Sequence, residues 1–149
     1  MIRGEGASQG KAPPTTAPHI YRLRVYFEDT DAGGMVYYAN YLKFMERCRT
    51  DWLRALGIDQ HRLRAERGLQ FAVVDVQVSY LRPAMLDDEV RVSAELTRMK
   101  GASFSFKQEI WRDAEQLIDA STRVVCLDST SLKPKAIPMD LFKEWRSEQ

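Results

Sequence analysis

Hydrophobic and polar residues alternate over several stretches of the chain, which is the pattern of β-strands with one buried face. In the first stretch, 21–27, apolar residues alternate with basic ones. The second half of the chain contains four more, at 74–80, 90–96, 104–110 and 118–126. Short turns, at Lys100-Gly101 and at Asp113–Glu115, separate the later stretches. Because parallel strands need long crossover connections, the pattern predicts an antiparallel meander.

A helical period appears between the first and second of these stretches. Apolar residues recur three and four positions apart, as on one face of an α-helix, at Tyr41, Phe44, Met45, Cys48, Trp52 and Leu56. Asn40 is a candidate N-cap, and Gly57 stands where a helix commonly ends. Burying each large apolar side chain is worth about 1.5–3 kcal/mol before the entropy cost. We therefore expect this helix to form the core against the sheet, although its stripe could instead line a pocket.

The other segments complete an α+β chain. Residues 59–67 are charged and are expected to form a short helix or an irregular link. Pro83 lacks a backbone donor and should end or bend the strand before it. Pro134 and Pro138 mark a loop that leads to a last short helix, Met139–Arg146. An antiparallel sheet with one apolar face can bury that face by wrapping around the long helix.

Length and charge limit the possible classes of protein. The 149 residues suit one domain, which we expect at 19–149, because residues 1–18 are poor in large apolar side chains and are predicted to be a disordered tail. The net charge of +1 gives no basic surface for nucleic acid. No stretch approaches the roughly 18 apolar residues of a transmembrane segment, and the N-terminus lacks a secretory core. We expect a cytoplasmic protein.

Cysteine and histidine residues offer little chemistry. Cys48 and Cys126 lie in apolar-periodic segments, so we expect buried free thiols rather than a disulfide, as suits a reducing compartment. His19 and His61 are far apart in the sequence, which gives little support for a metal site or a Ser-His-Asp triad. The sequence calls for no cofactor.

The candidate chemistry lies directly after the first predicted strand. Three acids, Glu28, Asp29 and Asp31, are followed by Gly33-Gly34 and by the start of the helix. Acids and glycines after a strand most often form only a turn. The same residues could also hold a carboxylate beside the free N–H groups of a helix N-terminus, a combination that can act on a carbonyl group.

The run from Arg24-Val25 through Thr30-Asp31, Gly34, Val36-Tyr37 and Tyr41 resembles the signature of the 4-hydroxybenzoyl-CoA thioesterase family. The longer string from Asp29 to Arg49 looks most like the Tol-Pal-associated acyl-CoA thioesterases of that family, and the resemblance covers roughly 19–146. It implies the hotdog fold, in which an antiparallel β-sheet wraps around one long central α-helix. It also implies an acyl-CoA thioesterase that forms a homo-oligomer, a dimer or a homotetramer, with sites built from two subunits.

The resemblance assigns roles to individual residues. Asp31 takes the position of the catalytic carboxylate, either as a nucleophile that gives a mixed anhydride or as a general base for water. The backbone N–H of Tyr38 takes the position of the oxyanion donor at the helix start. Asp29 remains a rival that could instead stabilise the turn, and Glu28 points to the other face in an extended segment.

Further residues are candidates for binding the substrate. Gly34, Val36 and Tyr37 belong to the motif and would line the site, whereas many Tol-Pal-associated relatives have a histidine where this chain has Tyr37-Tyr38. Asn40 is either a helix cap or a site residue, and Glu46 could lie near the site. For the phosphates of CoA the candidates are Arg98, Lys100 and Ser103, which could equally be ordinary turn residues.

Two other functions fit the same fold. A non-catalytic hotdog module would bind an acyl-CoA or an acyl carrier protein without releasing the thiol. A hotdog dehydratase would use a histidine in its site, and both histidines of this chain lie outside the motif. The intact acid loop favours the thioesterase.

Overall fold

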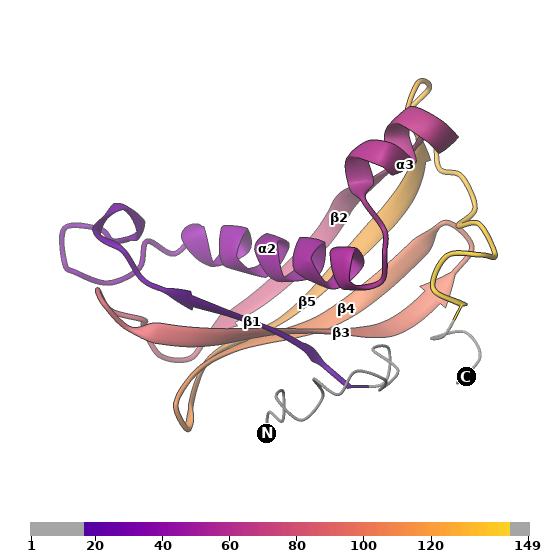
Figure 1. Cartoon of the computed structure of the whole chain (residues 1–149). Helices are drawn as coiled ribbons and strands as arrows, with labels where there is room; N and C mark the ends of the chain where they lie inside the picture. The colour runs from indigo at the N-terminus through magenta and orange to yellow at the C-terminus, as the bar shows by residue number, and fades with distance from the viewer. Residues whose placement is uncertain (1–16, 144–149) are drawn as a thin grey trace.

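The computed structural model describes residues 17–143, which form a five-stranded antiparallel sheet with two α-helices (Figure 1). In chain order the elements are β1 (His19–Arg24), the short 3-10 helix η1 (Phe27–Asp29), α2 (Asn40–Ala55), α3 (Gln60–Arg67), β2 (Leu69–Tyr80), β3 (Glu89–Lys100), β4 (Ser103–Arg112) and β5 (Glu115–Asp128). The predicted α+β class with an antiparallel sheet is confirmed. The predicted tail, 1–18, lies almost entirely outside the described residues.

The strand order is β1-β3-β4-β5-β2, so the predicted meander holds only for β3, β4 and β5. β2 does not pair with β3, because β1 and β4 occupy the two edges of β3. β2 instead pairs antiparallel with β5 and forms the far edge of the sheet. The prediction of a continuous meander was therefore wrong for β2.

The exposed edge strand β2 also departs from the predicted alternation. A bulge between Val73 and Asp75 shifts its register against β5. Val74, which the pattern assigned to the buried face, is 47 % exposed, whereas Val76 and Val78 are partly buried. A bulge adds a residue on one strand and so moves the following side chains to the other face.

α2 supplies much of the core, as its apolar stripe predicted. The helix packs on β1 and β3, and the curved sheet lies behind it (Figure 1). Its buried residues are Tyr41, Phe44, Met45, Cys48, Trp52 and Leu53. Leu56, the last residue of the predicted stripe, follows the helix and is only partly buried. Gly57 follows the helix with φ +83°, a conformation that a residue without a Cβ adopts readily. The buried thiol of Cys48 has its pKa raised to about 12 by desolvation.

Several element boundaries differ from those predicted. The first strand ends at Arg24 rather than at residue 27, because the Asp29 carboxylate accepts the Tyr26 N–H (2.8 Å) and closes η1. Phe27 is consequently 81 % exposed. Of the predicted last helix, Met139–Arg146, residues 139–142 form turns and Lys143 is helical, whereas residues 144–149 lie outside the described range.

Candidate active site

Asp31 begins a tight hairpin loop between η1 and α2. Its N–H donates to the carbonyl of Met35 (2.8 Å), and the Gly34 N–H donates to the carbonyl of Asp31 (3.0 Å). One carboxylate oxygen of Asp31 accepts the Gly33 N–H (2.9 Å), as an aspartate at the start of a turn commonly does. The turn expected from acids and glycines is thus present. No hydrogen bond to the second carboxylate oxygen is found within residues 17–143.

Asp29 has a structural role in this loop. Its carboxylate caps η1, and its carbonyl accepts two further donors, the Tyr37 N–H (3.0 Å) and the side-chain amide of Asn40 (2.9 Å). Asn40 is therefore not the N-cap that the sequence suggested, since α2 begins at Asn40 and the capping position is Ala39. These contacts join the loop of Asp31 to the start of α2.

The start of α2 leaves backbone donors free. The N–H groups of Tyr38 and Ala39 have no protein acceptor in the described part of the chain. The first N–H groups of a helix lack partners within the helix, and the helix dipole adds positive potential there. Tyr38 thus provides the free N–H that its predicted role requires.

Tyrosine side chains surround this helix start. The ring of Tyr38, which is 62 % exposed, lies 5.1 Å from that of Tyr37 and 6.1 Å from that of Tyr80. The Tyr80 hydroxyl also donates to the Tyr38 carbonyl (3.2 Å). The sequence pattern placed Tyr80 on the buried face of a strand, so its position beside Tyr38 was missed. Its place at the end of β2, just before a proline loop, was the only available signal.

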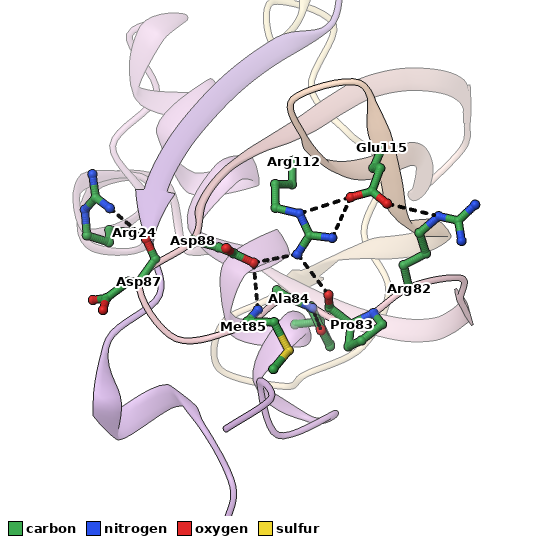
Figure 2. A network of polar contacts seen from close by, with 10 residues as sticks. Arg24, Arg82, Pro83, Ala84, Met85, Asp87, Asp88, Arg112 and Glu115 are labelled. Carbon is green, nitrogen blue, oxygen red and sulfur yellow. Dashed lines mark hydrogen bonds and ion pairs between the residues drawn. The ribbon is translucent and has the colours of Figure 1, made fainter. Parts of the chain in front are cut away.

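The loop between β2 and β3, residues 81–88, lies against the Asp31 hairpin. The N–H of Val36, a predicted site residue that is buried, donates to the Ala84 carbonyl (2.9 Å). The Leu86 N–H donates to the Gly34 carbonyl (3.2 Å). Figure 2 shows the polar network that holds this loop, centred on Arg112. Arg112 and Asp88 belong to no sequence motif and were missed by sequence reasoning, which treated Pro83 and Glu115 only as a strand end and a turn.

The residues predicted to bind CoA lie far from Asp31 in the same chain. Arg98, Lys100 and Ser103 are at the β3–β4 turn, where the Ser103 hydroxyl donates to the Lys100 carbonyl (3.3 Å). The Asp31 hairpin contacts the loop just before the other end of β3. At about 3.3 Å per residue, the 12 residues of β3 separate the two places by roughly 35 Å. Figure 1 shows them at opposite ends of the sheet.

Asp31 lies on the exposed surface of a single chain. Cavities of about 470, 290 and 140 Å³ lie elsewhere, around α3 and between α2 and the sheet. Glu46 lines the smallest of these and accepts the Thr50 hydroxyl (2.7 Å). Within residues 17–143 there is no group of acidic, histidine and cysteine side chains that could hold a metal ion, and no helix is long and apolar enough to cross a membrane.

Comparison with known proteins assigns the family. Residues 33–118 match the model of the thioesterase superfamily. The acyl-CoA thioesterase YbgC of Haemophilus influenzae is 42 % identical over 121 residues, which cover 81 % of this chain and 89 % of that protein. The acyl-CoA thioester hydrolase YbgC of Escherichia coli O6:H1 is 43 % identical over 125 residues, covering 83 % and 92 %. A crystal structure of a probable thioesterase from Bartonella henselae, 33 % identical, superposes with a TM-score of 0.78 over 82 % of this chain and all of that one.

The chain therefore belongs to the thioesterase superfamily, and it is a thioester hydrolase with the fold of the hotdog thioesterases. This confirms the family resemblance of the Asp31 motif. The match begins at Gly33, inside the Asp31 hairpin, and includes α2 and the start of β5.

Proposed function

We propose that this thioesterase hydrolyses acyl-CoA thioesters to a free carboxylic acid and CoA. The observation that carries the proposal is the hydrogen-bonded connection between a carboxylate and free backbone donors. The Asp31 carboxylate has one oxygen fixed by the Gly33 N–H, and the Asp29 carbonyl ties its loop to the start of α2. The names of the YbgC relatives favour acyl-CoA as the substrate class.

In the proposed mechanism, Asp31 acts on the thioester carbonyl in one of two ways. As a nucleophile, its carboxylate displaces CoA thiolate and forms a mixed anhydride, which water then hydrolyses to the acid. As a general base, it removes a proton from water, which attacks directly. In both routes the carbonyl oxygen gains negative charge, and the Tyr38 N–H at the positive end of α2 stabilises it.

We further propose that the active enzyme is a homo-oligomer, a dimer or tetramer, in a cytoplasmic, Tol-Pal-associated setting. β2 is an edge strand with exposed Val73 and Val74, and an unpaired edge is a surface on which another strand can add. Asp31 lies on the surface of one chain, so a second subunit could supply the missing wall of a substrate pocket. Sedimentation at several concentrations tests this, and a single-chain mass throughout would refute it.

Asp31→Asn tests the catalytic role, because asparagine keeps an oxygen for the Gly33 N–H while removing the charge. We expect a loss of about 100-fold or more in kcat across a panel of acyl-CoA thioesters, within the range of positioned acid–base groups. Asp87→Asn is the matched control, since asparagine tolerates the positive φ of 73° at that nearby acid. Equal rates for wild type and Asp31→Asn would exclude Asp31 as the catalytic carboxylate.

The same panel separates catalysis from binding alone. A non-catalytic module for acyl-CoA or acyl carrier protein would show saturable binding in calorimetry and no thiol release. The panel also measures the preference for chain length and for aromatic or aliphatic acyl groups.

A further inference from the structure

The loop 83–88 connects the Asp31 hairpin to α2 through a single residue, Ala84. Its carbonyl accepts the Val36 N–H (2.9 Å) from the hairpin, and its own N–H donates to the Tyr41 hydroxyl (3.0 Å) of α2. Both contacts involve buried residues, since Val36, Tyr41 and Ala84 are all 4 % exposed or less. The position of Ala84 therefore affects how the carboxylate of Asp31 stands relative to the helix start.

A second hydrogen bond extends this support along the hairpin. The Leu86 N–H donates to the Gly34 carbonyl (3.2 Å), and together with the Val36–Ala84 bond it sets Met35 opposite Met85 in an antiparallel bridge. Met85 is itself fixed, because its N–H donates to the Asp88 carboxylate (2.8 Å). Three consecutive residues of the hairpin, 34–36, are thus paired with the loop 83–88.

Arg112, at the end of β4, holds this loop at both ends (Figure 2). Its guanidinium donates to the Pro83 carbonyl (3.1 Å) and to the Asp88 carboxylate (2.6 Å). It also donates twice to Glu115 (2.6 and 3.2 Å), which fixes the orientation of the guanidinium plane. The side chains of Arg112 and Asp88 are each 22 % exposed, so water competes less for this pair than for a fully exposed one.

We propose that Arg112 is a positioning residue for the thioesterase reaction. It fixes the loop 83–88 from Pro83 and Asp88, and the loop in turn fixes the hairpin of Asp31 against α2. The inference rests on the proposed role of Asp31. A misplacement of about 1 Å can cost on the order of 100-fold in rate, so a residue that does not touch the substrate can control kcat.

The test compares Arg112→Met, Arg112→Lys and Arg82→Met in the full chain. Arg82 is the matched control, because it also binds Glu115 (3.6 Å) but is 60 % exposed, and its side chain makes no hydrogen bond or ion pair with Pro83 or Asp88 within the described residues. Each variant is measured for kcat and KM, for thermal midpoint, and for amide hydrogen exchange at Val36 and Leu86. Amides of the central strands β3 and β4 serve as the internal reference.

For Arg112→Met we expect at least about a ten-fold loss in kcat with KM within about two-fold. Exchange at Val36 and Leu86 should accelerate at least ten-fold while the reference amides keep their rates. Arg112→Lys retains a cation for Asp88 and should recover part of both effects, and Arg82→Met should resemble wild type. If Arg112→Met does not fold, Asp88→Asn serves as the milder variant, since it keeps an oxygen for the Met85 N–H and removes the charge that Arg112 binds.

Unchanged exchange at Val36 and Leu86 in Arg112→Met would overturn the inference, whatever the kinetics. A rise in exchange that is equal in β3 and β4 would also overturn it, because it would show general destabilisation. A wild-type protein that releases no CoA would refute the proposed function, and the exchange measurement would still decide whether Arg112 holds the hairpin.

Discussion

The Asp31 hairpin depends on one glycine for its conformation, and Gly34→Ala isolates that dependence. Gly34 has φ +81°, and a Cβ added there would meet nothing within 4 Å. The substitution therefore introduces backbone strain without a steric clash. The left-handed conformation costs a residue with a Cβ roughly 1–2 kcal/mol, so we expect a loss of about 1 kcal/mol in the free energy of unfolding.

Gly33→Ala provides the matched control one residue away. Gly33 does not have a left-handed φ, and its added Cβ would come no closer than 3.4 Å, to the Asp31 carboxylate. Its N–H remains available to the Asp31 carboxylate. We therefore expect a much smaller loss of stability from this change than from Gly34→Ala.

Urea unfolding at fixed protein concentration measures both variants. With a slope of about 2 kcal/mol per molar, a loss of 1 kcal/mol lowers the midpoint by about 0.5 M. For a domain of this length, the same loss lowers Tm by roughly 2–4 °C. Because a relaxed Gly34→Ala hairpin would move Asp31, kcat should fall as well. Equal stability of the two alanine variants would refute the argument that the left-handed turn constrains the hairpin.

Two further predictions concern association and pH. Val74→Lys, which puts a charge on the exposed edge of β2, should shift the sedimenting species towards the single chain, whereas Thr97→Lys on the inner strand β3 should not. Arg67 lowers the pKa of Asp140 from 3.8 to about 2 through a side-chain hydrogen bond, so this ion pair stabilises the fold above pH 3.8 and ceases to do so as the pH falls towards 2. The stability difference between wild type and Arg67→Met in chemical denaturation should therefore be constant above about pH 5, shrink below pH 3.8 and disappear as the pH falls through about 2.

Local sequence patterns predicted the helices and strands correctly where the face buried in the structure matches the hydrophobic period of the sequence. The stripe of α2 is buried from Tyr41 to Trp52 as its spacing implied, although Leu56 is only partly buried, and Gly57 follows the helix in the left-handed conformation. The turns at Gly101 and Asp113 join β3, β4 and β5 as expected. These features depend on residues close in sequence, which is why period and turn chemistry could identify them.

Long-range pairing could not be predicted in the same way. β2 lies at the far edge of the sheet because β1 and β4 pair with the two edges of β3. The position of β2 therefore depends on how β1, β3 and β4 pair and not on the sequence of β2 alone. The bulge at Val73 arises from that pairing and reverses the exposure expected of Val74. The contact of Arg112 with Asp88 spans 24 residues and leaves no local pattern. For the proposed site, the motif singled out Asp31 and Tyr38, but it indicated neither the supporting loop nor the place of Tyr80.

Pairing of two β2 edges in the proposed dimer would bear on both the exposed edge of β2 and the distance between Asp31 and the β3–β4 turn. Tyr80, at the end of β2, lies beside Tyr38, whereas Leu69, at the start of β2, pairs near the β3–β4 end of the sheet. If two β2 edges pair antiparallel about a two-fold axis, the Tyr80 end of one chain meets the Leu69 end of the other. Arg98, Lys100 and Ser103 would then come to the same end of the combined sheet as Asp31 of the other chain. The separation of roughly 35 Å within one chain therefore does not by itself exclude these residues from a site shared by two subunits of the proposed dimer.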